Sequence, residues 1–129
     1  MIVDSSALLA ILQQEPDAQA IAVALAQGHP RRLSAASFVE TSIVMEARQA
    51  DAGIRELDNL LHRAAIEIVA VDEQQARLAR EAYRHFGKGR HRAGLNFGDC
   101  FAYALAKSLD EPLLCTGKDF RQTDIPVVL

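Results

Sequence analysis

The first twelve residues constrain the fold more than any other stretch of the chain. Residues 1–3 form a short apolar run, Asp4 ends it, and Ser5 and Ser6 lead directly into the apolar, helix-like pattern of residues 7–12. A run this short and apolar is typical of a buried strand of a parallel sheet that feeds a helix. Such sheets bind ligands beyond the carboxyl ends of their strands. We therefore expect Asp4 to lie at a binding crevice.

Helical and strand patterns alternate along the rest of the chain. We expect helices over residues 5–14, capped by Ser5 or Ser6, then over 17–27, from Ser37 to a break at Gly53, and over 54–65, 72–86 and 97–108. Strands are expected over residues 31–36, 66–71, 112–116 and 125–129. This alternation predicts a three-layer α/β/α domain around a parallel sheet of four to five strands. With 129 residues and no repeat or linker, residues 1–129 are expected to form one domain.

Composition excludes several classes of protein. The net charge of -3 argues against a basic footprint spread over the whole molecule. We expect no membrane span, because no apolar run approaches about 18 residues, and no signal peptide, because the first residues lack a basic segment. Cys100 and Cys115 are too few for a disulfide framework and are expected to be reduced thiols in the cytoplasm. The four histidines are scattered, so a histidine-based metal site is not expected.

Four acidic residues are predicted to share one edge of the sheet. Asp4 ends the first strand, Glu40 lies in the first turn of the helix after the second strand, and Asp99 lies in the first turn of the helix before the fourth strand. Asp119 follows the fourth strand by a few residues. In a parallel sheet these positions all lie at the carboxyl edge. We therefore expect the four carboxylates to converge.

Helix capping is an alternative explanation for two of these acids. Ser37 with Glu40, and Asn96 with Asp99, have the spacing of a capping box, as Asp72 has with Gln75. Acids in a first turn also gain about 0.3–1 kcal/mol from the helix dipole. Each acid taken singly is therefore explained equally well by a structural role.

Capping explains neither Asp4, which ends a strand, nor Asp119, which lies in a turn next to a glycine. Carboxylates gathered at one edge repel each other, so such a cluster favours a bound cation. Oxygen ligands alone suit Mg²⁺ or Mn²⁺. A hard cation held by carboxylates favours phosphoryl chemistry, because it can activate a water and stabilise a leaving oxygen.

A basic segment precedes Asp99. Residues 87–94 are glycine-rich, without periodicity, and contain Lys88, Arg90, His91 and Arg92. We expect this flexible loop to border the acidic pocket and to bind a polyanion whose scissile phosphate reaches the metal. A solvated loop without a ligand is the alternative.

Four stretches together resemble a PIN domain, and more narrowly the VapC toxins of bacterial VapBC toxin–antitoxin pairs. They are MIVDSSAL (1–8), SFVE (37–40), LNFGDCFAYALA (95–106) and LLCTGKDFRQTDI (113–125). The resemblance covers the whole chain in order, and NFGD is its most specific part. It implies a five-stranded sheet in the order 3-2-1-4-5.

The resemblance also implies a function. It implies a Mg²⁺- or Mn²⁺-dependent endoribonuclease that cleaves structured RNA such as tRNA or ribosomal RNA, with Asp4, Glu40, Asp99 and Asp119 as catalytic acids and the first three on the metal. It implies a VapB-type antitoxin that blocks the pocket, and a homodimer held largely by the helices after strands two and one. The RNA-binding residues are then expected to be Lys88, Arg90 and Arg92.

Supporting roles are predicted for Ser5, Asn96 and Thr116, which can orient carboxylates or water; ordinary capping and turn bonding is the alternative. One departure from the family pattern is Lys118, where relatives often have Asn or Asp. An ammonium there can pair with Asp119, which leaves open a catalytically weak PIN-like module that acts through its antitoxin.

A phospho-receiver domain has a similar sheet and an acidic Mg²⁺ pocket. It requires a pair of acids after the first strand, whereas Asp4 is followed by two serines. The residues therefore favour the ribonuclease.

Overall fold

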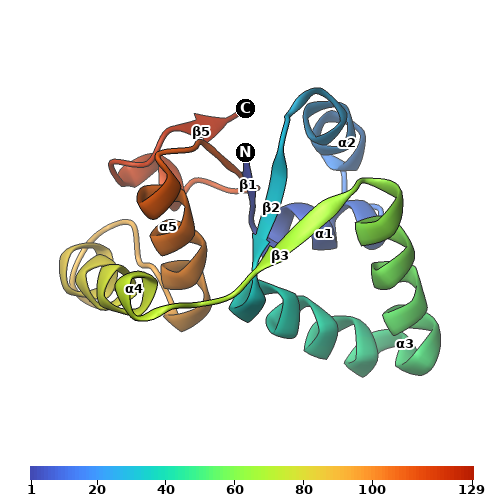
Figure 1. The fold of residues 1–129 in the computed structure, drawn as a ribbon, viewed down its shortest axis with the longest axis horizontal. Coiled ribbons are helices and arrows are strands. Elements are labelled where there is room, and N and C mark those ends of the chain that lie inside the picture. Colours follow the sequence, from blue (N-terminus) through green and yellow to red (C-terminus); the bar gives the residue numbers. More distant parts are fainter.

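The computed structural model describes residues 1–129 and has a five-stranded parallel sheet at its centre. The strands pair in the order β3-β2-β1-β4-β5, as predicted, so β1 is central (Figure 1). They are β1 (Ile2–Val3), β2 (Arg31–Ser34), β3 (Ile66–Val69), β4 (Leu113–Leu114) and β5 (Val127–Val128). The helices are α1 (Ser5–Leu12), α2 (Ala18–Gln27), α3 (Ala35–Arg63), α4 (Glu73–Phe86) and α5 (Phe97–Leu109), with a 3₁₀ turn η1 (Phe120–Gln122).

The sheet separates two apolar cores, which confirms the three-layer architecture. Successive side chains of a strand point to opposite faces. Ile2 and Leu113 accordingly join the core formed with α4 and α5. Val3 and Leu114 join the core formed with α1, α2 and α3. Figure 1 shows α4 and α5 on one side of the sheet and the other three helices on the other side.

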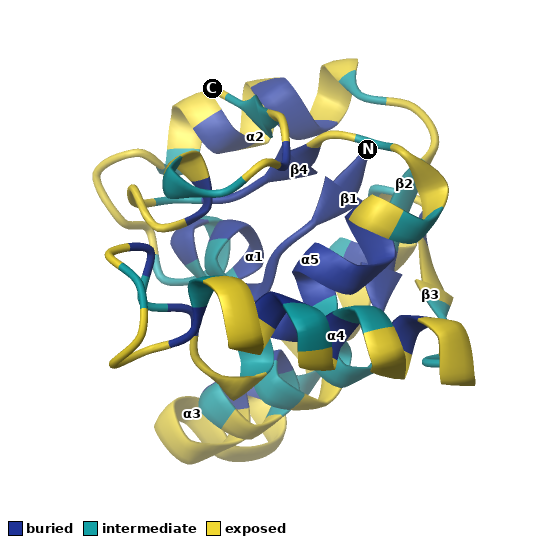
Figure 2. Cartoon of the chain, turned by 90° about the vertical axis from the view of Figure 1, so that its left-hand side faces the viewer, coloured by how far each residue is buried: buried dark blue, intermediate teal, exposed yellow.

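Helix α5 contains the longest continuous run of buried residues of any helix. Its residues 102–106 are all buried, and Figure 2 shows it as a mostly buried element behind α4. The expected capping box is complete, because the Asn96 side chain accepts from the Asp99 N–H and the Asp99 side chain accepts from the Asn96 N–H. The helix ends within one residue of its predicted end.

The predicted break and cap of α3 are wrong. Ser34, not Ser37, is the N-cap, and its hydroxyl accepts from the Ala36 N–H. The helix changes direction at Ala50 (φ 52°, ψ −138°) rather than at Gly53. Gly53 lies just beyond the bend, where a Cβ would stand 2.8 Å from the carbonyl carbon of Met45. The glycine is therefore needed for the close approach of the two arms, and the bend itself is three residues earlier.

The other boundaries differ from prediction by a few residues. Asp72 caps α4 as expected, but its capping box is incomplete because the Gln75 side chain donates to the Ala70 carbonyl instead. Helix α1 ends at Leu12, two residues early. None of the helices combines the length and the apolar character that a bilayer crossing demands.

Candidate active site

Asp4 lies at the carboxyl end of central strand β1 and is 3% exposed. It is also the N-cap of α1, so the prediction that Ser5 or Ser6 caps this helix is wrong, as is the statement that capping does not involve Asp4. Its Oδ2 accepts from the Ser6 N–H at 3.0 Å and from the Ser6 hydroxyl at 2.5 Å. The other oxygen, Oδ1, takes no hydrogen bond from the chain.

Glu40 comes to the same place from α3. It lies in the second turn of the helix rather than the first, because α3 begins at Ala35. Its Oε1 accepts from the Ser5 hydroxyl at 2.7 Å. The capping box predicted from Ser37 and Glu40 is therefore wrong, and helix capping does not account for Glu40.

Asp99 lies in the first turn of α5 and is partly exposed. One of its oxygens, Oδ2, accepts from the Asn96 N–H at 3.0 Å in the capping box. Asn96 therefore supports Asp99 by fixing the start of α5. The capping interpretation of Asp99 is correct, but it engages only one carboxylate oxygen.

Asp119 is exposed and directly precedes η1, whose first residue, Phe120, is buried and anchors the segment. Upstream of it, the Thr116 N–H donates to the Ser6 hydroxyl at 3.1 Å. Thr116 is thus tied to the site through its backbone amide. Lys118 is exposed to solvent beside Asp119.

Charge interactions link Asp99 to each of the other three carboxylates. Burial, aided by the charges of Asp99 and Glu40, raises the pKa of Asp4 to about 6, although the Ser6 hydrogen bonds act to lower it. Burial also raises the pKa of Asp99, the Asn96 N–H lowers it, and the charges of Glu40 and Asp119 raise it. The structure therefore brings together all four acids predicted from the sequence.

Cys115 lies in the same electrostatic environment. Burial, together with the charges of Asp4, Asp99 and Asp119, raises its pKa to about 12, against a smaller opposing effect of Arg121. Burial and the charge of Asp99 raise the pKa of Cys100 to about 11. Both thiols therefore stay protonated and unreactive at neutral pH.

The donor atoms fit a hard divalent cation. All four groups supply carboxylate oxygens, the ligands that Mg²⁺ and Mn²⁺ prefer. As the side chains stand, no three of them meet at bonding distance. Asp4, Glu40 and Asp99 each give one oxygen to a hydrogen bond from the chain. Each therefore keeps a second oxygen for a ligand, and the charge repulsion among them favours a cation.

Two supporting residues were not predicted. Ser6 bridges the Asp4 carboxylate and the Thr116 amide, so it joins the segments that follow β1 and β4. Gly98 lies against the Glu40 carboxylate. A hydroxyl two residues after a strand-ending acid is a weak signal for Ser6, whereas the contact of Gly98 depends on tertiary packing.

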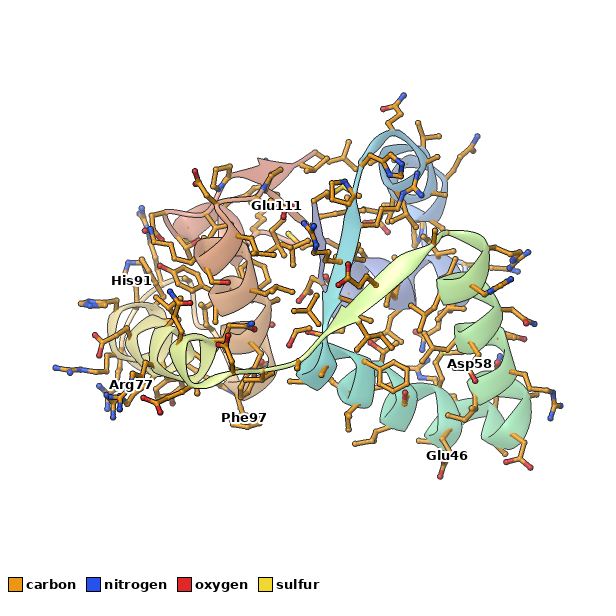
Figure 3. All side chains as sticks on the ribbon, viewed as in Figure 1. Glu46, Asp58, Arg77, His91, Phe97 and Glu111 are labelled. Carbon is orange, nitrogen blue, oxygen red and sulfur yellow. The ribbon has the colours of Figure 1, made fainter.

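The basic segment lies beside the start of α5. Lys88, Arg90 and Arg92 are all exposed. The Lys88 N–H donates to the Leu95 carbonyl at 2.9 Å, which closes the loop at its base. Lys88 also lines a groove of about 540 Å³ with Asn96 and Phe97. In Figure 3, Phe97 projects from the lower end of α5, and His91, which belongs to the loop after α4, lies beside that helix.

The PIN domain family pattern matches residues 1–126. The chain belongs to the PIN-domain family. It is 56% identical over 128 residues to Ribonuclease VapC30 of Mycobacterium tuberculosis, covering 99% of this chain and 98% of the relative. It is also 56% identical to Ribonuclease VapC of Mycolicibacterium smegmatis, covering 99% of both. Within the family it is therefore a VapC-type ribonuclease, and such enzymes generally depend on a divalent metal.

Solved structures share the fold. Mycobacterium tuberculosis VapC20, a toxin that cleaves the sarcin–ricin loop, superimposes with a TM-score of 0.80 at 15% identity, covering 98% of this chain and 97% of that one. VapBC-1 from nontypeable Haemophilus influenzae gives 0.72 at 21% identity, covering 98% and 95%. The fold and the family predicted from the motifs are both confirmed.

Proposed function

We propose that this VapC-type ribonuclease is the toxin of a type II toxin–antitoxin pair and cleaves structured RNA, either tRNA or ribosomal RNA, in the cytoplasm. The observation that carries the proposal is the gathering of four carboxylates, from four separate segments, at the carboxyl edge of the sheet. The burial of Asp4 and the charges of Asp99 and Glu40 together raise the pKa of Asp4 to about 6. The VapC relatives support the same activity.

Asp4, Glu40 and Asp99 are the residues proposed to hold Mg²⁺ or Mn²⁺. When bound, the cation would supply activation of a water and stabilisation of the leaving 3′ oxygen. Ser5 and Ser6 keep Glu40 and Asp4 in place through their hydroxyls. Asp119 is the most exposed of the four, and it is proposed to orient a water or to accept its proton. With water as the nucleophile, products carry a 5′ phosphate and no 2′,3′-cyclic end.

Substrate binding is proposed for Lys88, Arg90 and Arg92. Their exposed charges match the phosphate backbone of RNA, which dominates nucleic-acid affinity. Structured RNA is distinguished mainly by shape and by unpaired bases, so this small cationic loop is proposed to supply phosphate contact while other surfaces set specificity.

Two protein partners are proposed. A VapB-type antitoxin is supported by solved VapBC structures of the same fold. A homodimer is supported by α3, which exposes Val39 (53%) and Ile43 (63%) one turn apart. Helix α1 exposes no large apolar side chain, so the dimer contact is assigned to α3 more than to α1.

The test is cleavage of total cellular RNA by purified, antitoxin-free protein with Mg²⁺, with Mn²⁺ and with EDTA, beside Asp4→Ala. Discrete fragments that require metal and vanish with the variant are expected. Equal cleavage by Asp4→Ala would show that the site is misplaced. Cyclic 2′,3′ ends would overturn the mechanism.

A catalytically weak binding module is the second candidate, because Lys118 directly precedes Asp119 in the chain and its ammonium could pair with that carboxylate. It predicts that folded, metal-binding protein captures its antitoxin but cleaves no RNA under any of these conditions. Lys118→Asn would then restore cleavage if the ammonium is the cause.

A further inference from the structure

Gly98 and Glu40 come from different helices and touch at the active site. Gly98 is the second residue of α5, directly before Asp99. A Cβ built on it would lie 2.8 Å from Cδ and 2.9 Å from Oε1 of Glu40, and closer still to Oε2. Real Cβ atoms essentially never lie this close to another heavy atom. The Glu40 carboxylate therefore occupies the space that any side chain at position 98 would need.

The backbone of Gly98 does not require glycine. Gly98 is helical, and a helix accepts alanine more readily than glycine. Gly117, by contrast, has φ +79° and open space around it. Glycine at position 98 is thus explained by the absent side chain and not by the backbone conformation.

Ser5 holds the same carboxylate by a hydrogen bond. Its hydroxyl donates to Glu40 Oε1 at 2.7 Å, while Gly98 leaves room for Oε2. A glutamate side chain loses considerable rotamer entropy when it is fixed, so an unheld Glu40 would sample many positions. The hydrogen bond and the vacant space together select one of them, next to Asp99.

We propose that Gly98 is a positioning residue of the active site: its missing side chain lets Glu40 lie against the start of α5, within reach of the cation that Asp4 and Asp99 share. The inference rests on the proposed function of Glu40 as a metal ligand. It assigns the NFGD stretch a second role beside capping, because the glycine acts on an acid of another helix.

The first test is Gly98→Ala, with Mn²⁺ binding measured by calorimetry and folding measured by thermal melting. Loss of a residue that orients a ligand typically weakens metal binding by about 10–100-fold. We expect a loss in that range, with a metal-free melting temperature close to that of the unaltered protein. Unchanged Mn²⁺ affinity would overturn the proposal.

Rescue separates positioning from general damage. Glu40→Asp withdraws the carboxylate by one methylene, which makes room for a Cβ at position 98. Alone it loses the Ser5 hydrogen bond and should weaken Mn²⁺ binding. Combined with Gly98→Ala it should restore part of the affinity that Gly98→Ala loses. A double variant as weak as the product of the two single losses would mean that the two residues act independently, contrary to the proposal.

Two controls complete the design. Gly53→Ala places a Cβ against the backbone of Met45, far along α3, and should lower the melting temperature without changing the Mn²⁺ affinity of the folded protein. Glu40→Gln tests the proposed function itself. If it leaves Mn²⁺ binding intact, Glu40 is not a ligand and the proposed site is wrong. If it weakens binding while Gly98→Ala does not, only the role of Gly98 is refuted.

Discussion

Two opposing influences act on the Asp4 carboxyl. Burial and the nearby charges of Asp99 and Glu40 favour the protonated form, whereas the Ser6 hydrogen bonds favour the ionised form. Burial dominates, so the pKa rises from 3.8 to about 6. The raised pKa means that this helix-capping carboxyl ionises less readily than a free one. A cation bound nearby would stabilise the ionised form and lower the pKa again.

The raised pKa predicts how stability depends on pH without metal. The folded protein holds the Asp4 proton more tightly than the unfolded chain, so this contribution to stability is present below about pH 4. It is lost as the pH rises through about 6, at a cost of about 3 kcal/mol. Urea unfolding in EDTA between pH 4 and pH 7 measures it. Asp4→Asn should flatten this part of the profile, and an equal slope in the variant would assign the effect to another group.

Asp99→Asn separates catalysis from capping. The amide keeps an oxygen that can accept from the Asn96 N–H but removes the charge that repels Glu40 and Asp119. We expect cleavage to fall more than about 100-fold, beyond the loss typical of residues that only orient a ligand. The melting temperature of the metal-free variant should equal or exceed that of the parent. A variant that unfolds would show that Asp99 acts chiefly as a cap.

The helices differ in how far their local sequence determines where they begin and bend. Helix α5 was predicted within one residue because its start signal is local: Asn96 and Asp99 satisfy each other's backbone groups. Helix α3 was not, because Ser34 and Ser37 are both able to cap and the choice depends on where β2 ends. The bend at Ala50 has no local signal at all.

The acids were predictable because the carboxyl edge of a parallel sheet collects them whatever the side-chain packing. The residues that hold these acids in place were harder to predict. Ser5 was predicted and donates to Glu40, but the roles of Ser6 and Gly98 appear only when α1, α5 and the segment after β4 are packed together. Sequence therefore identified the charged groups and missed much of what holds them.

The loop between α4 and α5 should contribute affinity and little specificity. Replacing Lys88, Arg90 and Arg92 by alanine removes three exposed cations from this loop. If each contacts a phosphate, the slope of log affinity against log salt should fall in magnitude by about 2–3. Fluorescence anisotropy with a catalytically inactive Asp4→Ala background and an RNA hairpin, at several salt concentrations, measures the slope.

A matched control keeps the overall charge change the same. Arg48, Arg55 and Arg63 are exposed on α3, on the opposite side of the sheet from α4 (Figure 1). Their replacement by alanine should leave the salt slope nearly unchanged. Equal effects of the two triple variants would mean that RNA responds to net charge and not to the loop.

At the scale of the whole molecule, α3 exposes an apolar face that the packing of the chain does not explain. The two most apolar strands, β1 and β4, are fully buried, as their sequences predict, whereas Val39 and Ile43 of α3 remain exposed. The strands are only two to four residues long, so the order of the sheet was predicted from the family resemblance and not from the strand residues. An exposed apolar face such as that of α3 marks an interaction site when it is extended.

The homodimer proposal predicts the effect of a charge on this face. A stable dimer buries about 800 Å² per partner, against a total accessible surface of 7101 Å², so the contact must extend along α3 beyond these two side chains. Ile43→Asp places a carboxylate in the centre of the proposed contact. Because Ile43 is 63% exposed, the change should leave the fold intact by circular dichroism. It should dissociate the dimer in analytical ultracentrifugation.

The matched control is Ile68→Asp, at an isoleucine that is 43% exposed on edge strand β3. This variant should keep the dimer. A parent protein that is monomeric at tens of micromolar, or an Ile43→Asp variant that still dimerises, would refute the assignment of α3 as the interface.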